Sequence, residues 1–151
     1  MAKISILAGV ALAFALVAGT SFAGEQLSYQ VTDSGIETSL TGKSGDPSAG
    51  TKVMINRKLG NCLACHKVSA LSDQPFHGEV GPSLDGAADR WTEAQLRLIV
   101  VDAKKLFPDT IMPSFLTTEG RNRVMKKFKG KTILTPEQAE DVVAFLKTLK
   151  E

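Results

Sequence analysis

The five residues from Cys62 to His66 limit the possible folds of this chain more than any other stretch. They form the pattern C-x-x-C-H, which is typical of covalent haem attachment. Two thiols at this spacing can each form a thioether with one edge of a porphyrin, and the adjacent imidazole can then reach the iron from one face. We therefore predict one covalently bound haem c, with Cys62 and Cys65 as its attachment points and His66 as an axial ligand.

Two closely spaced cysteines have three other interpretations: a redox-active dithiol, half of a zinc site, or a disulfide. A thioredoxin-like dithiol needs no following histidine and lies near a βαβ pattern, which we do not find in this sequence. A four-ligand zinc site needs a second pair of ligands, and the chain has no further cysteine and only one other histidine, His77. The haem interpretation is therefore favoured.

Residues 1–23 have the pattern of a secretory signal peptide. Lys3 supplies the positive charge, residues 4–18 are almost entirely apolar, and Ser21 and Ala23 place small residues at −3 and −1 of a cleavage site. The apolar run is shorter than the about 20 residues that span a bilayer. We therefore expect a periplasmic protein with no stable membrane insertion.

The charge of the mature chain is nearly balanced. Loss of Lys3 with the leader leaves 17 basic residues against 16 acidic ones, which is not the charge of a nucleic-acid-binding protein. The distribution is uneven, because residues 104–131 hold eight basic and two acidic residues, whereas residues 24–103 hold seven and ten. We therefore expect one basic region on an otherwise balanced surface.

Three amphipathic segments predict helices, at 46–60, 92–107 and 135–149, and no segment convincingly predicts a strand. Each segment opens with a capping signal: Asp46 before Pro47, Thr92 with Gln95, and Thr135 with Pro136 and Gln138. Pro108 is expected to end the second helix. The fold class is therefore all-α, with a helical haem domain at 46–151. Residues 24–45 form an N-terminal arm for which a loose arm, a short strand and disorder all remain open.

A haem iron held by His66 needs a sixth ligand or keeps a vacant site, and the two cases predict electron transfer and small-molecule binding respectively. Met112 is the best candidate, because it lies in a proline-stiffened loop at 109–115 where a side chain can be fixed without helical packing. Met54 is expected in the core, Met125 on the surface, and His77 in a solvent-facing loop. Trp91 is expected to pack near the haem edge, where its N–H could reach a propionate.

These landmarks resemble the class I cytochromes c. The shared order is the C-x-x-C-H motif, then Gly81-Pro82, then Met112-Pro113. The resemblance implies that the Pro82 carbonyl orients His66, and that Gly50 and Phe145 lie at the crossing of the first and last helices.

A narrower resemblance, over roughly residues 46–150, is to the SoxX family of small cytochrome subunits. It is carried by residues 60–66, 90–97, 109–115, 118–124 and 133–149. The resemblance implies a SoxA-type cytochrome partner and a complex that oxidatively couples thiosulfate to a cysteine of a SoxYZ-type carrier protein, an L-cysteine S-thiosulfotransferase activity. Electrons would then pass to a downstream cytochrome. The catalytic haem of that family belongs to the SoxA-type subunit, so we expect an electron relay here, and both cysteines of this chain are consumed by its own haem.

Two alternative functions remain. A free-standing periplasmic electron shuttle would use the basic residues of 116–134 as a salt-sensitive docking patch. A permanent subunit would instead bury Phe115, Leu116 and Val124 in an interface and leave most of the lysines outside. A haem sensor or peroxidase with a labile Met112 is the least favoured hypothesis.

Overall fold

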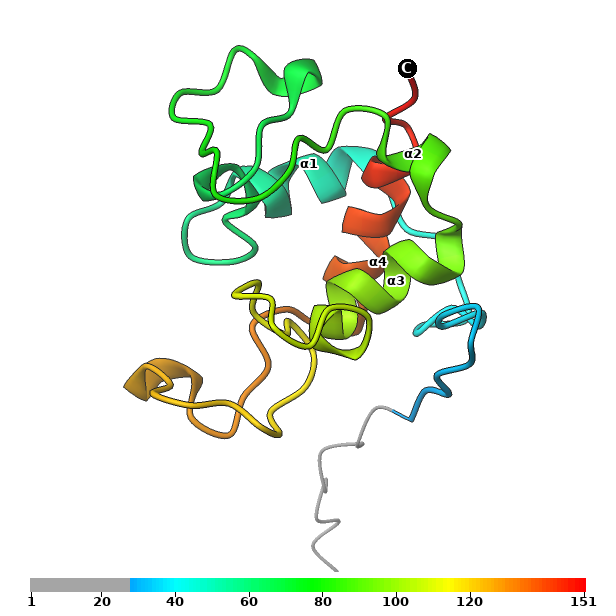
Figure 1. Ribbon diagram of the computed structural model, residues 1–151, viewed down its shortest axis with the longest axis vertical. Coiled ribbons are helices and arrows are strands. Elements are labelled where there is room, and N and C mark those ends of the chain that lie inside the picture. The colour runs from blue at the N-terminus through cyan, green and yellow to red at the C-terminus, as the bar shows by residue number, and fades with distance from the viewer. Residues whose placement is uncertain (1–27) are drawn as a thin grey trace, which may run out of the picture.

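The computed structural model describes residues 28–151, so the expected signal peptide and the first residues of the arm lie outside the described part. Four α-helices are present: α1 (Pro47–Ile55), α2 (Ala87–Arg90), α3 (Glu93–Asp102) and α4 (Pro136–Leu146). Four short 3-10 turns complete the set: η1 (Cys62–Ala64), η2 (Ser69–Leu71), η3 (Ala103–Lys105) and η4 (Lys126–Phe128). Within residues 28–151 the only β pairing is an isolated bridge between Thr32 and Gly35. The all-α prediction is therefore confirmed (Figure 1).

The predicted helix starts are confirmed at the level of individual hydrogen bonds. Asp46 accepts a bond from the Ser48 amide, and complete capping boxes open α3 and α4. The predicted helix ends are less accurate. The first helix stops at Ile55 rather than near residue 60, and α3 stops at Asp102, well before Pro108. Asp102 leaves the helical conformation because its side chain instead caps η3 through the Lys104 amide.

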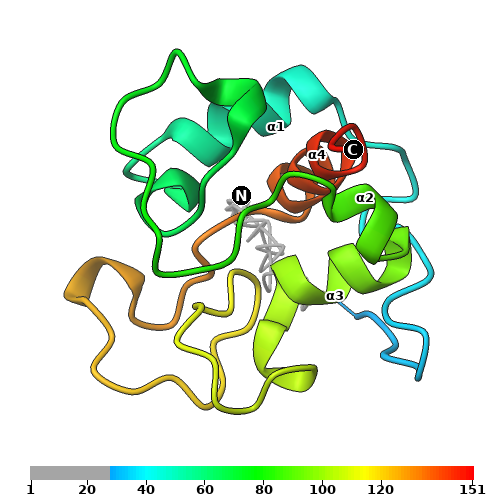
Figure 2. The ribbon, with the colours of Figure 1, turned by 45° about the horizontal axis from the view of Figure 1, so that its top comes forward.

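The crossing of α1 and α4 forms the centre of the fold (Figure 2). Gly50 makes this crossing possible, since a Cβ atom at this position would lie 2.0 Å from the Asp141 carbonyl oxygen and 3.0 Å from the Phe145 Cβ. No side chain fits there, so the backbones approach more closely than any other residue would allow. The expected contact of Gly50 with Phe145 is therefore confirmed. The core around it is made mainly of Val53, Met54, Val100, Val101, Ala139, Val142, Val143 and Leu146.

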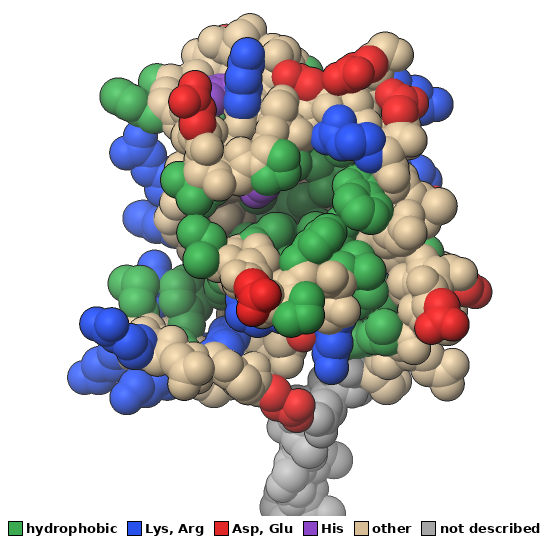
Figure 3. Space-filling view, viewed as in Figure 1, with side chains coloured by type: hydrophobic (Ala, Val, Ile, Leu, Met, Phe, Trp, Pro, Cys, Tyr) green, Lys and Arg blue, Asp and Glu red, His purple; other side chains and the backbone are tan. Residues whose placement is uncertain are grey.

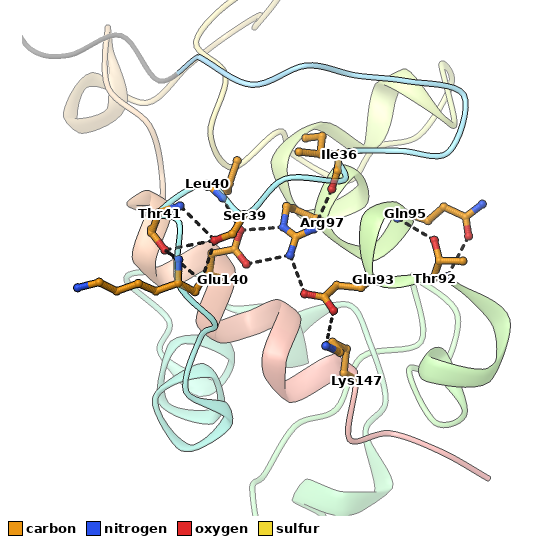
Figure 4. Close-up of polar contacts among 11 residues, drawn as sticks. Ile36, Ser39, Leu40, Thr41, Thr92, Glu93, Gln95, Arg97, Glu140 and Lys147 are labelled. Atoms are coloured by element: carbon orange, nitrogen blue, oxygen red, sulfur yellow. Dashed lines mark hydrogen bonds and ion pairs between the residues drawn. The ribbon is translucent and has the colours of Figure 1, made fainter.

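The described part of the arm, residues 28–45, is an irregular segment docked on α3 and α4. Ile36 is fully buried, and its amide donates to the Ala94 carbonyl at 3.0 Å. Arg97 donates to the Ile36 carbonyl at 2.8 Å, and Glu140 accepts from the Leu40 amide at 2.8 Å (Figure 4). The arm thus satisfies its backbone groups against helix side chains rather than in a strand.

Arg97 and Glu140 form a buried ion pair under the arm. Each has 3% of its side chain exposed, and the Arg97 Nε lies 2.7 Å from a Glu140 carboxylate oxygen. Arg97 also contacts Glu93, which in turn pairs with Lys147 near the end of α4 (Figure 4). This network ties the arm, α3 and α4 into one unit.

No helix in residues 28–151 is long and apolar enough to cross a membrane.

Candidate haem site

The C-x-x-C-H motif folds into a single tight turn. Cys62–Ala64 form η1, and the amides of Cys65 and His66 both donate to the Cys62 carbonyl, at 3.1 and 2.9 Å. The two cysteines are half-buried and are not joined in a disulfide. Burial raises the pKa of the Cys62 thiol to about 12, so the free thiol stays protonated near neutral pH. Such a thiol is a poor redox nucleophile.

The His66 ring is oriented by the backbone of the loop that follows the motif. Its Nδ1 lies 2.7 Å from the Pro82 carbonyl oxygen. A carbonyl only accepts hydrogen bonds, so Nδ1 carries the proton and Nε2 keeps its lone pair. Gly81 allows this approach, because a Cβ there would lie 2.3 Å from the ring Cε1. The geometry leaves His66 prepared to bind a metal through Nε2.

Backbone hydrogen bonds hold the Pro82 loop against the motif. The amides of Gly78 and Gly81 donate to the carbonyls of Leu63 and Cys65, both at 2.8 Å. Asp85 braces the same loop from outside, since it accepts from the Ser69 amide and hydroxyl, both at 2.7 Å. These bonds from Ser69 hold the pKa of the Asp85 carboxyl below its usual value. Sequence reasoning gave Asp85 no role, although Gly86, which follows it, is one of the glycines and prolines that indicated a loop here.

His77 differs from its expected place in a solvent-facing loop. The ring is half-buried, its Nδ1 accepts from the Val68 amide at 3.1 Å, and its Nε2 lies 3.1 Å from the Leu71 carbonyl oxygen. The expectation was wrong because a position in a loop does not by itself make a side chain solvent-facing. This ring turns inward and satisfies two backbone groups at the η2 turn. With both nitrogens engaged, His77 has no nitrogen left for a metal.

Met112 lies in a short irregular loop attached to the end of α3. Its side chain is partly buried against the hydrophobic core, while the neighbouring Ile111 is 81% exposed. The Met112 amide donates to the Thr110 hydroxyl at 3.2 Å, and its carbonyl accepts from Lys104 Nζ at 2.8 Å. The backbone at Met112 is therefore fixed on both its amide and its carbonyl side, and its side chain packs against the hydrophobic core.

The other methionines occupy the places expected for them. Met54 is fully buried in the core, and Met125 is 63% exposed beside η4. Met54 belongs to α1 and Met125 has an exposed side chain, so neither matches the partly buried loop position of Met112.

A hollow lined by hydrophobic side chains opens on one face of the molecule (Figure 3). Several partly buried apolar side chains pack against the hydrophobic core, among them Leu59, Leu84, Leu106, Met112 and Ile133. Trp91, expected near the haem edge, is partly buried and packs edge-to-face on Phe107 with ring centroids 5.9 Å apart. The two free cysteines, the oriented imidazole of His66 and an apolar hollow on the molecule together fit a haem c. No group of three or more His, Cys, Asp or Glu side chains in residues 28–151 is arranged to hold a metal ion by itself.

The interface expected at Phe115, Leu116 and Val124 is not present as proposed. Phe115 and Leu116 are 5% and 7% exposed, because they pack in the chain's own core, and only Val124 is half-exposed. Buried residues of this kind cannot distinguish a permanent subunit from a shuttle. Several basic residues between 121 and 131 are exposed on a lobe that projects from the helices (Figure 1), as expected from their density in the sequence.

Comparison with known proteins agrees with this geometry. The family model described as Cytochrome c matches residues 48–150. Among solved structures, the chain is similar to one in the crystal structure of SoxXA from P. pantotrophus, with 48% sequence identity and a TM-score of 0.75, covering 82% of this chain and 95% of that one. A comparison with curated proteins found no match. The haem c predicted from the motif is the cofactor that the family binds covalently. The chain therefore belongs to the cytochrome c family, as a monohaem cytochrome of the SoxX type.

Proposed function

We propose that this cytochrome is the electron-relay subunit of a SoxAX-type complex in the periplasm. The observation that carries the proposal is the His66 ring oriented by the Pro82 carbonyl in a C-x-x-C-H turn, together with 48% identity to a chain of a SoxXA structure. In such a complex thiosulfate is joined to a cysteine of a SoxYZ-type carrier protein, and two electrons leave the sulfur groups. This chain would receive them from a SoxA-type partner and pass them to a downstream cytochrome.

Five residues would hold and orient the haem. Cys62 and Cys65 would form the two thioethers, and His66 would bind the iron through Nε2 with its ring held by the Pro82 carbonyl at 2.7 Å. Met112 would fill the sixth position from the loop after α3. When bound, a haem with these two ligands supplies reversible one-electron transfer.

The residues of this chain favour relay over bond-making at the sulfur atoms. Both of its cysteines are taken by the haem, so no thiolate remains to react with sulfur compounds. A thioether at the sixth position closes the iron to substrates and raises its potential, which suits an electron acceptor. The bond between thiosulfate and the carrier would therefore be made on the partner subunit.

Met112→Ala tests the proposed ligand set. The haem-loaded variant is expected to lose the thioether-to-iron charge-transfer band of the ferric spectrum, to have a lower potential and to bind cyanide rapidly. Met125→Ala is the matched control, because this exposed methionine lies outside the core. An unchanged spectrum in Met112→Ala would exclude Met112 as the ligand.

Complex formation separates the proposal from a free-standing shuttle. Mature haem-loaded protein and a SoxA-type cytochrome should elute together from a size-exclusion column at moderate salt, since a permanent subunit interface does not depend mainly on long-range charge. A shuttle docking through the basic residues of 121–131 would show only weak association that disappears as salt is added. Separate elution at every salt concentration would contradict the subunit proposal.

A further inference from the structure

Lys104, in the η3 turn, contacts the Met112 loop at two points. Its Nζ donates to the carbonyl of Thr110 at 3.0 Å and to the carbonyl of Met112 at 2.8 Å. These carbonyls lie on either side of Ile111, which points outward and is 81% exposed. A single ammonium group therefore fixes the backbone both before and at Met112. Hydrogen bonds from a charged donor are stronger than those between neutral groups.

Asp102 anchors the other end of the same loop. The Ser114 hydroxyl donates to its carboxylate at 2.6 Å, and both residues are buried. The Lys104 amide also donates to this carboxylate, at 3.3 Å. Residues 110–114 are thus tied at both ends to one turn of chain at the end of α3, and Pro113 between the two anchors restricts the backbone further.

We propose that Lys104 is a positioning residue for the sixth haem ligand, acting through its two bonds to the Met112 loop and assisted by Asp102. The inference rests on the proposed role of Met112. With the backbone pinned at Met112 itself, the thioether would be kept where it could bind the haem iron, which would disfavour replacement by another ligand. Without the Lys104 bonds, the Met112 carbonyl would lose its partner. The loop would then be held only at its ends, by the Thr110 amide on the Phe107 carbonyl and by Ser114 on Asp102, and the thioether would move away more often.

The test compares Lys104→Ala with Lys105→Ala in the haem-loaded ferric protein. Both changes remove one exposed lysine, but Lys105 makes no side-chain hydrogen bond within the described residues. Imidazole is the probe, because it binds ferric iron only after Met112 has left. Loss of two bonds is expected to raise the imidazole affinity of Lys104→Ala by about tenfold, while Lys105→Ala stays at the wild-type value. Lys104→Arg, which keeps a charged donor with several N–H groups, should recover most of the wild-type affinity.

The possible results separate the inference from the proposal on which it rests. If wild-type protein shows the thioether-to-iron band and Lys104→Ala binds imidazole no better than Lys105→Ala, the Lys104 inference is wrong and Met112 remains the ligand. If the wild-type protein lacks the band, both fail. Lys104→Ala should also have a lower reduction potential than the wild type. A fall in potential that accompanies the gain in imidazole affinity would support the positioning role, because a merely structural loss would not change both quantities together.

Discussion

Replacing Glu140 by alanine would test the buried ion pair that holds the arm to the helices. Glu140 is 3% exposed and accepts three hydrogen bonds: two from Arg97, at 2.7 and 3.2 Å, and one from the Leu40 amide at 2.8 Å. Burial alone would lower the pKa of Arg97, but its carboxylate partners outweigh this and raise it, so the guanidinium stays charged. The variant would leave this buried charge with Glu93 as its remaining carboxylate, and Glu93 is 45% exposed.

The expected cost follows from this geometry. Breaking a buried pair by removing one partner costs about 3–5 kcal/mol, because the remaining charge stays buried; here the guanidinium would keep only the partly exposed Glu93. For a domain of this size that corresponds to a fall in melting temperature of roughly 10–20 °C. Urea denaturation of the haem-loaded protein should show a lower midpoint with an unchanged slope. Glu79→Ala is the control, since Glu79 is exposed and makes no ion pair within residues 28–151.

The double variant Arg97→Met with Glu140→Leu distinguishes charge burial from packing. Replacing both charges by apolar groups removes the buried guanidinium that has lost its buried partner, so the double variant should be more stable than Glu140→Ala. A Glu140→Ala protein destabilised by less than about 1 kcal/mol, or a double variant less stable than the single one, would refute this account of the pair.

Three further changes test other parts of the fold. Gly50→Ala should cost several kcal/mol, at least about 2, because its Cβ would lie 2.0 Å from the Asp141 carbonyl oxygen; near-wild-type urea stability would contradict the crossing. The Glu93 carboxyl has its pKa lowered from 4.5, chiefly by the hydrogen bond from Lys147, so its contribution to stability is full above 4.5 and is lost as pH falls through the lowered value. Glu93→Gln should therefore be less stable than wild type at neutral pH and equal to it in strong acid, as measured by urea unfolding at both; a gap that persists in strong acid would exclude the linkage. His77→Ala should cost about 1–3 kcal/mol, because a buried backbone amide loses its acceptor, whereas a ring free in solvent would cost almost nothing.

The sequence predicted the features that depend on neighbours along the chain. Capping boxes join residues three positions apart, so Thr92 with Gln95 and Thr135 with Gln138 can be recognised without knowing the fold. The haem motif is local for the same reason. The contact between Gly50 and Phe145 is distant in sequence, and only the resemblance to class I cytochromes c pointed to it.

The features that were missed depend on partners far apart in the chain. Arg97 and Glu140 are charged residues on amphipathic helices, where charge usually indicates a solvent-facing position. They are buried because they pair with each other and also bond to backbone groups of the arm. A local sequence pattern cannot indicate contacts among three segments that are far apart in the chain.

The loop contacts were missed for a related reason. Lys104 belongs to a run of basic residues that suggested a solvated surface, yet its ammonium group binds two carbonyls of the Met112 loop. Phe115 follows the same loop and was expected at an interface, but the chain folds back and buries it in its own core. Tertiary packing decided these positions, and hydrophobicity alone does not say which protein will cover a side chain.

Thiosulfate-dependent haem reduction tests the central claim most directly. Oxidised, haem-loaded mature protein would be mixed with thiosulfate and a SoxYZ-type carrier, with and without a SoxA-type cytochrome, and its own haem absorbance followed over time. The relay account predicts rapid reduction only when the SoxA-type subunit is present. Equal reduction without that subunit, or no reduction of this haem when it is present, would contradict the account.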